Sequence, residues 1–364
     1  MATTKHSNVD LLIAGAGPAG MMASMYLSEH GVKHRIIDRR GTRKLNGRAD
    51  GLMTRTVEIW DSYSIADKIS SVAASFGEWS LWSFDGDIQA GHEHLAARRV
   101  QPLVSWKIAG VVNGQLSPKI LSTYEHGRIP VARRLIAHDR DMAAVLTARQ
   151  DRDGAAINKI YARLQENNGT LLQYDHCSLV TADGDTARQS AASELKLGTT
   201  FPDVTVWSQA RGDMAWSQSL LKSNGQWRLM VFAGDVAQIS QLATVNSLGD
   251  QIVQLATTND VELPDFHEAY FPLDEVAGRR YDTIYADWPS EGKDDTTVNA
   301  HKAYGVDPNK GALVLIRPDQ FVAWVESLED LGALEEWLAR FMLAEREPRR
   351  DSGQDRESTE STDI

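Results

Sequence analysis

The chain has 364 residues, of which 42% are hydrophobic and 24% are charged, proportions typical of a globular protein rather than a collagen or a disordered chain. A single cysteine, Cys177, excludes an internal disulfide framework. The net charge of −12 argues against a nucleic-acid partner and against binding to an anionic membrane surface. Because no apolar run is as long as a membrane span, we expect a cytoplasmic protein of two or three domains.

The N-terminal segment alternates between strand and helix patterns. Val9–Ala14 is a short apolar run that predicts a buried strand. A glycine loop follows, and Pro18–His30 then predicts a helix, because proline suits the first turn of a helix. Val32–Ile37 predicts a second strand, which ends at Asp38, and Thr54–Tyr63 predicts a further helix. This order is typical of a Rossmann-like unit.

The loop between the first predicted strand and helix reads Gly15-Ala16-Gly17-Pro18-Ala19-Gly20, which is the G-x-G-x-x-G pattern. Gly15 suits the tight turn, Gly17 lets backbone N–H groups approach a pyrophosphate, and Gly20 lets the helix pack on the strand. Asp38 lies 18 residues after Gly20, where an acidic side chain can accept hydrogen bonds from a ribose. The pattern predicts a dinucleotide site and does not separate NAD from FAD; the alternative is an incidental turn.

A basic patch interrupts the otherwise acidic chain. Five lysines and arginines lie between Arg39 and Arg48, directly after the predicted second strand. A phosphate-bearing ligand would explain this local charge, and a solvated loop is the alternative.

The remaining elements follow in chain order. Apolar periodicity predicts strands, helices and a Ser/Ala/Asp-rich linker, and a polar tail is typical of disorder. The predicted strands are Glu78–Phe84, Arg228–Ala233 and Ala312–Arg317; the helices are Trp106–Asn113, Leu116–Thr147 and Leu328–Phe341; the linker is centred on Ser178–Ser193; and the tail is Arg346–Ile364.

The segment after the basic patch resembles a known family. Asn46–Leu52, Thr54–Trp60 and Ala66–Ile69 are similar to the FAD-dependent aromatic hydroxylases, most closely to the phenol 2-monooxygenase branch known from fungi. In that family the glycine loop binds the ADP half of FAD, and the loop around Asp50 lies beside the flavin and the substrate. The resemblance implies that Asp50 is a catalytic residue and that Arg48 contacts the cofactor.

Without the resemblance, Asp50 would be read as an aspartate that caps the loop before Gly51. The motif and the resemblance together assign the following residues to the cofactor: Gly15, Ala16, Gly17, Pro18, Ala19, Gly20, Asp38, Arg39, Arg48 and Asp50.

The C-terminal half continues the resemblance. From about Gly198 the chain is similar to the thioredoxin-like domain of the family, on the evidence of Phe201–Asp203, Val231–Asp235 and Arg317–Val325. In the family this domain supports dimerisation and is not redox-active, so the resemblance implies a homodimer. The absence of a Cys-x-x-Cys pair agrees.

The match breaks between about Gly86 and Ser105, where the much longer family members carry most of the substrate-domain sheet and two further flavin fingerprints. We therefore predict an α/β protein with a shortened Rossmann-like FAD-binding domain, split in sequence, followed by a thioredoxin-like α/β domain. The predicted parts are an N-terminal FAD-binding half (1–85), a junction (86–104), a helical remainder of the FAD domain (105–150), a linker (151–194), the dimerisation domain (195–345) and a disordered tail (346–364).

The resemblance implies an activity. In the family, NADPH reduces FAD, the reduced flavin captures O₂ as a C4a-hydroperoxide, and a phenolic substrate gains an ortho hydroxyl group. We expect no metal, because His92-Glu93-His94 lacks a third ligand at a recognisable spacing. Two alternatives stay open because of the missing central region: a catalytically inactive remnant that serves as a dimerisation partner, and a truncated gene product.

Overall fold

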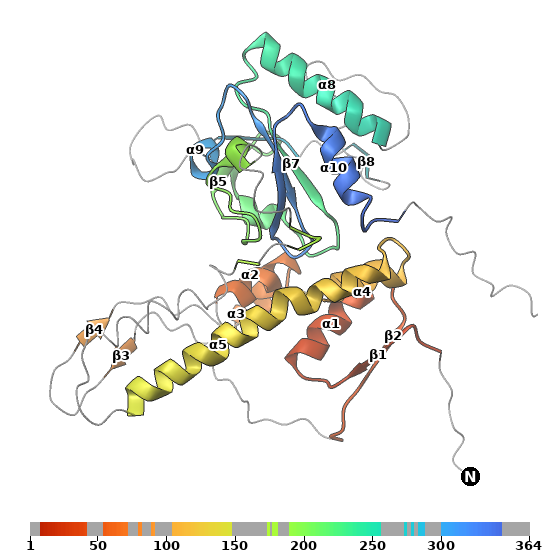
Figure 1. Ribbon diagram of the computed structural model, residues 1–364, viewed down its shortest axis with the longest axis vertical. Coiled ribbons are helices and arrows are strands. Elements are labelled where there is room, and N and C mark those ends of the chain that lie inside the picture. The colour runs from red at the N-terminus through yellow and green to blue at the C-terminus, as the bar shows by residue number, and fades with distance from the viewer. Residues whose placement is uncertain are drawn as a thin grey trace, which may run out of the picture.

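The structure is a computed structural model, and two groups of elements stand out in it (Figure 1): N-terminal helices around a small parallel sheet, and C-terminal strands with their own helices. It describes residues 8–41, 54–71, 79–81, 89–91, 104–147, 173–174, 177–180, 189–255, 273–274, 278–279, 283–287 and 300–343. No helix in this part of the chain combines the length and the apolar character needed to cross a membrane.

The N-terminal unit is a strand–helix–strand crossover. Strands β1 (Leu11–Ala14) and β2 (His34–Ile37) pair in parallel, and helix α1 (Pro18–Glu29) connects them. This confirms the predicted element order, although both strands begin two residues later than predicted. The chain leaves α1 through Gly31, whose φ of +64° is a conformation that favours glycine.

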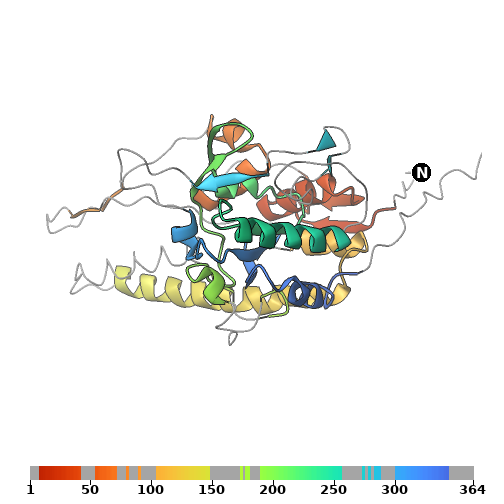
Figure 2. The same ribbon diagram turned by 90° about the horizontal axis from the view of Figure 1, so that it is seen from above.

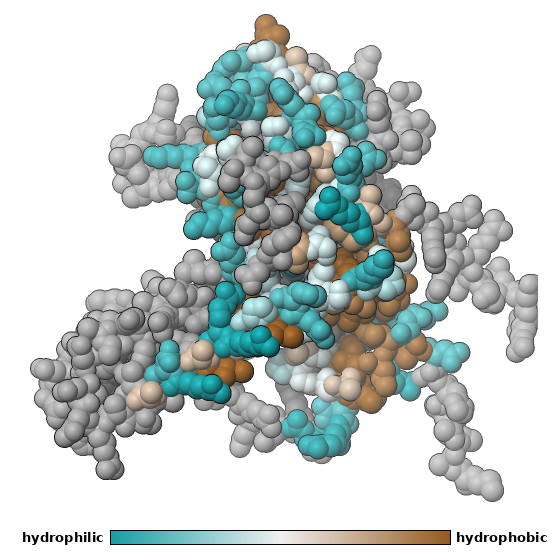
Figure 3. Space-filling view, in the orientation of Figure 1, coloured by the Kyte–Doolittle hydropathy of each residue, from teal (hydrophilic) through white to brown (hydrophobic). Residues whose placement is uncertain are grey.

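The described residues cover the two-stranded sheet on one face only. Residues Leu11 and Ile13 pack against the core, whereas Leu12 and Ile37 on the opposite face are exposed, as is Met21 of α1. A brown area over α1, β1 and β2 in Figure 3 marks this apolar surface. Parallel sheets in α/β proteins are normally covered on both faces, so the apolar residues on the second face of β1 and β2 are an unusual feature.

After the strand–helix–strand unit, the N-terminal half of the chain is mainly helical. They are α2 (Thr54–Ser62), α3 (Ala66–Ser70), α4 (Ser105–Val112), the 3-10 helix η1 (Pro118–Ser122) and α5 (Thr123–Thr147), with a short strand pair β3 (Trp79–Leu81) and β4 (Gln89–Gly91) before α4. The C-terminal end of α5 extends beyond the C-terminal sheets in both views (Figures 1 and 2).

The single helix predicted from Leu116 begins later than expected. Leu116 instead forms an isolated antiparallel bridge with Met342, and the helical turns start at Pro118. A contact with the distant end of the chain therefore replaces the first turn of the predicted helix.

The C-terminal half contains two three-stranded antiparallel sheets, ordered β10-β5-β6 and β12-β11-β7. Its elements are β5 (Thr205–Ser208), β6 (Asp213–Trp216), β7 (Arg228–Phe232), α8 (Ile239–Leu255), β8 (Leu273–Asp274), β9 (Gly278–Arg279), β10 (Tyr285–Asp287), α9 (Ala300–Tyr304), β11 (Ala312–Ile316), β12 (Val322–Glu326) and α10 (Leu331–Leu338), with 3-10 turns η2 (Ser190–Ala192) and η3 (Ser217–Leu220). These strand pairings do not test the thioredoxin-like assignment of the C-terminal domain, which stays a prediction.

Strand β11 lies between two hydrophobic clusters, and its side chains alternate between them. Leu313 and Leu315 belong to a cluster shared with Tyr26 and Trp106 of the N-terminal half. Val314 and Ile316 belong to a second cluster within the C-terminal half. Alternation of this kind follows from the two-residue period of a strand. The first cluster therefore joins the two halves of the chain through one core.

The predicted linker over 151–194 is described only at 173–174, 177–180 and 189–194. At these positions Leu179, Val180 and Ala192 are buried, so they pack as core residues rather than as a solvated connection. The predicted tail, 346–364, lies outside the described residues. The predicted domain boundaries themselves stay a prediction.

Candidate cofactor site

The glycine loop joins β1 to α1 as a tight turn. Gly15 has a φ of +112°, and its N–H donates to the carbonyl oxygen of Ile37 at 2.7 Å, which ties the loop to the end of β2. A Cβ atom built on Gly20 would overlap the carbonyl oxygen of Gly15. Gly20 is therefore required for the close packing of α1 on the loop.

Gly15 and Gly17 differ from Gly20, because a Cβ atom built on either would meet nothing within 4 Å. Gly17 is the N-cap of α1, where unpaired backbone N–H groups and the helix dipole favour an anion. The open space beside these backbones is what a pyrophosphate would occupy.

Asp38 closes the other side of the loop. Its Oδ2 accepts the N–H of Ala16 at 2.9 Å, and its Oδ1 accepts the N–H of Arg40 at 2.8 Å. These two backbone hydrogen bonds hold the pKa of the Asp38 carboxyl below its usual range. A carboxylate oxygen can accept more than one hydrogen bond, so Asp38 keeps capacity for ribose hydroxyls.

An open hollow of about 450 Å³ lies at this end of the sheet, lined by Ala14, Gly15, Ile37, Asp38, Arg39 and Arg40. Its volume is in the range of ligand clefts. Exposed arginines at its rim place positive charge where phosphates would lie. The residues present therefore fit the nucleotide half of a dinucleotide cofactor.

The sequence-predicted residues divide into two groups. The structure brings the loop from Gly15 to Gly20 together with Asp38 and Arg39. Arg48 and Asp50 lie outside the described residues, as do His92 and His94. The assigned roles of all these residues stay predictions.

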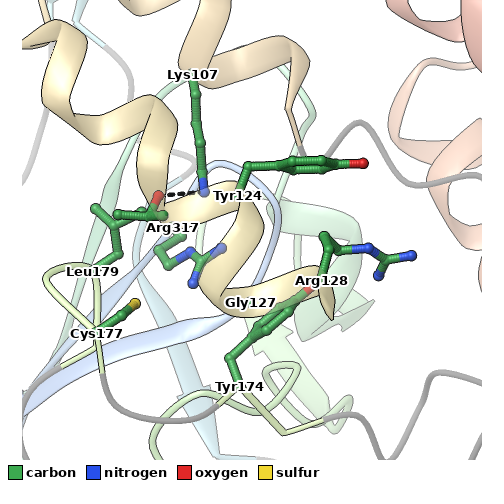
Figure 4. Close-up of a pocket in the computed structure, with 9 residues that line it drawn as sticks. Lys107, Tyr124, Gly127, Arg128, Tyr174, Cys177, Leu179 and Arg317 are labelled. Carbon is green, nitrogen blue, oxygen red and sulfur yellow. Dashed lines mark hydrogen bonds between the residues drawn. The ribbon is translucent and has the colours of Figure 1, made fainter. Parts of the chain in front are cut away.

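A second polar cluster, which the sequence did not single out, is buried between the two halves. Arg317 and Asp319 form a two-point ion pair, with nitrogen–oxygen distances of 3.0 and 2.6 Å. Trp106 on α4 donates its indole N–H to Asp319 at 3.2 Å. Next to Trp106, the Lys107 ammonium donates to the Thr123 hydroxyl at 2.6 Å, as the dashed line in Figure 4 marks. No motif spacing could have revealed these contacts.

Two family models match the chain in order. One, described as "FAD binding domain", matches residues 8–101. The other, described as "Phenol hydroxylase, C-terminal dimerisation domain", matches residues 172–258 and 251–346.

The curated relatives include fungal monooxygenases. The FAD-dependent monooxygenase ankC of Aspergillus thermomutatus is 28% identical over 323 residues, which cover 81% of this chain and 52% of the relative. The phenol 2-monooxygenase fsqG of Aspergillus fumigatus is 27% identical over 296 residues, which cover 76% of this chain and 50% of the relative. The chain thus spans about half the length of these relatives.

A solved structure shares the fold. The crystal structure of aklavinone-11 hydroxylase in a ternary complex with FAD and aklavinone matches 92% of this chain and 99% of its own, with a TM-score of 0.52 and 14% identity. This likeness agrees with the predicted α/β FAD-binding fold class. The two family models and the fungal relatives confirm the resemblance to the FAD-dependent aromatic hydroxylases.

Proposed function

We propose that the chain binds FAD at the glycine loop and acts as a phenol-type monooxygenase in the cytosol. The observation that carries the proposal is the open backbone at Gly15 and Gly17 beside Asp38 and the arginine-rimmed hollow. The proposed reaction uses NADPH and O₂ to add a hydroxyl group ortho to the hydroxyl of a small phenolic substrate. The fungal phenol 2-monooxygenase among its relatives supports this substrate class.

Each residue has a physical role in the proposal. The backbone N–H groups at Gly17 and the start of α1 hold the pyrophosphate, Asp38 accepts the ribose hydroxyls, and Arg39 offsets phosphate charge. FAD, when bound, supplies the redox and oxygen chemistry. Arg48 contacts the cofactor, and Asp50 takes part in orienting and deprotonating the phenol.

The C-terminal half supports a further part of the proposal, a homodimer. The match to a dimerisation domain covers the whole of the predicted thioredoxin-like region, 195–345. A second copy of this chain is therefore the proposed partner.

The visible absorption spectrum of the purified chain tests cofactor binding. We expect the absorption band of oxidised flavin in the wild type and its loss in Gly17→Val, because a Cβ atom at Gly17 meets nothing within 4 Å and the new side chain would fill the proposed pyrophosphate space. Gly332→Val is the matched control, since a Cβ atom on this exposed residue of α10 also meets nothing within 4 Å. A folded, colourless wild type would contradict the proposal.

Substrate turnover tests the activity separately. We expect NADPH oxidation that is stimulated by a phenol and yields a hydroxylated product. A flavin-loaded chain without any phenol-dependent product would contradict the monooxygenase activity while leaving cofactor binding intact.

Asp38→Ala should weaken FAD binding without unfolding the chain. The loss of hydrogen bonds from the ribose to a charged acceptor is expected to raise the Kd for FAD by about 10- to 100-fold. Quenching of flavin fluorescence on titration measures this Kd. Asp10→Ala, which removes an exposed carboxylate next to β1, should leave it unchanged; an equal effect of both variants would show that Asp38 has no special role.

A further inference from the structure

Among the residues that the structure describes, no carboxylate pairs with the buried cation Lys107. It is 3% exposed, and its contacts in the described part of the chain are the Thr123 hydroxyl and the Trp106 ring, whose centroid lies 5.6 Å from Nζ. A buried charge is costly unless an opposite charge or several hydrogen bonds compensate it. One hydroxyl acceptor is a small compensation for an ammonium with three donors.

The surrounding charges do not balance Lys107. Arg317 is also buried, and Asp319 is engaged with it in the two-point ion pair. Within the described part of the chain, one carboxylate therefore faces two buried cations. The other titratable groups that line the cavity beside Lys107 are Tyr124, Arg128, Tyr174 and Cys177, and the buried Tyr174 hydroxyl lies next to Arg128.

A small cavity lies between these groups. In Figure 4 the Lys107 ammonium and the Arg317 guanidinium point into the same space, whereas the Arg128 guanidinium points away from it. The lining also includes Tyr174 and Cys177. The cavity leaves about 10 Å³ for the centre of a water-sized sphere, which is about the space that one water-sized species needs and too little for an organic molecule.

We propose that this cavity binds one small monovalent anion of the halide class, with chloride as the physiological ion, between Lys107 and Arg317. The anion restores charge balance between the two buried cations. Because Lys107 belongs to α4 and Arg317 follows β11, the ion joins the two halves of the chain. This site is separate from the glycine loop, and the proposal does not depend on flavin binding.

The pH dependence has a defined sign. Burial and the nearby Arg317 lower the pKa of Lys107 to about 8, against the opposing effects of Asp319 and Cys177. Lys107 is therefore mostly protonated at neutral pH. Its charge, and with it the anion affinity, is lost as the pH rises above about 8.

Thermal unfolding of the whole chain tests the site. We expect the wild-type Tm to rise by about 2–4 °C when chloride replaces gluconate at constant ionic strength and neutral pH. This increase should saturate with chloride concentration. Gluconate is the reference anion because it is too large for the cavity. The chloride effect should shrink at about pH 9.5 and vanish in Lys107→Met. The matched control Lys119→Met, at an exposed position on η1, should keep it.

A Tm that responds identically to chloride and gluconate in the wild type would overturn the proposal, because the cavity would then hold water or nothing. Line broadening of ³⁵Cl in magnetic resonance gives a second readout that needs no variant. We expect the folded wild type to broaden the ³⁵Cl resonance. Added bromide should reverse this broadening along a binding curve for a single site. Absence of broadening, or broadening that bromide does not reverse, would also overturn the site.

Discussion

Asp319→Asn is expected to lower the free energy of unfolding by roughly 3–5 kcal/mol, the usual cost of breaking a buried ion pair from one side. Asp319 is 4% exposed and is the carboxylate that compensates Arg317. The asparagine keeps the shape but removes the charge, so Arg317 and Lys107 remain buried together. Asp319 now accepts hydrogen bonds from the Arg317 guanidinium and the Trp106 indole. In the variant, an amide group would face these same two donors.

The chain contains a matched control for this variant. Arg211 and Asp213 form an ion pair with the same spacing in sequence and a nitrogen–oxygen distance of 3.0 Å, but both side chains are at least half exposed. Exposed pairs of this kind contribute about 0–1 kcal/mol, so Asp213→Asn should have little effect. Urea unfolding followed by circular dichroism and tryptophan fluorescence measures both variants. Equal losses would contradict the special role of the buried pair.

The same variant tests whether the two halves unfold together. Because Asp319 contacts Trp106 across the shared core, its loss should shift one common transition rather than only the C-terminal signal. Two separate transitions in the wild type would show that the halves are thermodynamically independent domains.

The sequence predicted the N-terminal unit well because its determinants are local. The apolar runs, the glycine loop and the proline at the start of α1 all act within a few residues. Strand β11 was predictable for a similar reason, since a strand buried on both faces reads as a continuous apolar run. Which side chains face which cluster could not be predicted, because that depends on the distant elements that cover each face.

The buried cluster was out of reach for the same reason. Trp106 and Asp319 are 213 positions apart, and Lys107 looks in sequence like an ordinary charged residue on a helix. The bridge between Leu116 and Met342 is another long-range contact that shortened a predicted helix. Local periodicity contains no information about such partners.

Gly20→Ala is expected to lower the free energy of unfolding by about 1–3 kcal/mol, the range for overpacking a tight contact. It is also expected to abolish flavin binding. The added methyl group would overlap the Gly15 carbonyl oxygen and lie 3.3 Å from Cγ2 of Ile13. Both neighbours belong to the short β1 segment or its turn, and a backbone carbonyl cannot move aside as a flexible side chain can. The start of α1 must therefore shift away from the loop, which displaces the N–H groups proposed to hold the pyrophosphate.

Comparison with two other glycines separates packing from ligand binding. Gly332→Ala, at an exposed position in α10, should raise stability slightly, by about 0.4–1 kcal/mol, because alanine restricts the unfolded chain. Gly17→Val should leave stability near the wild-type value and remove flavin, whereas Gly20→Ala should remove both. Urea unfolding and the flavin absorption band distinguish these patterns. If Gly20→Ala kept both wild-type stability and flavin, α1 could not pack on the loop as closely as the structure places it.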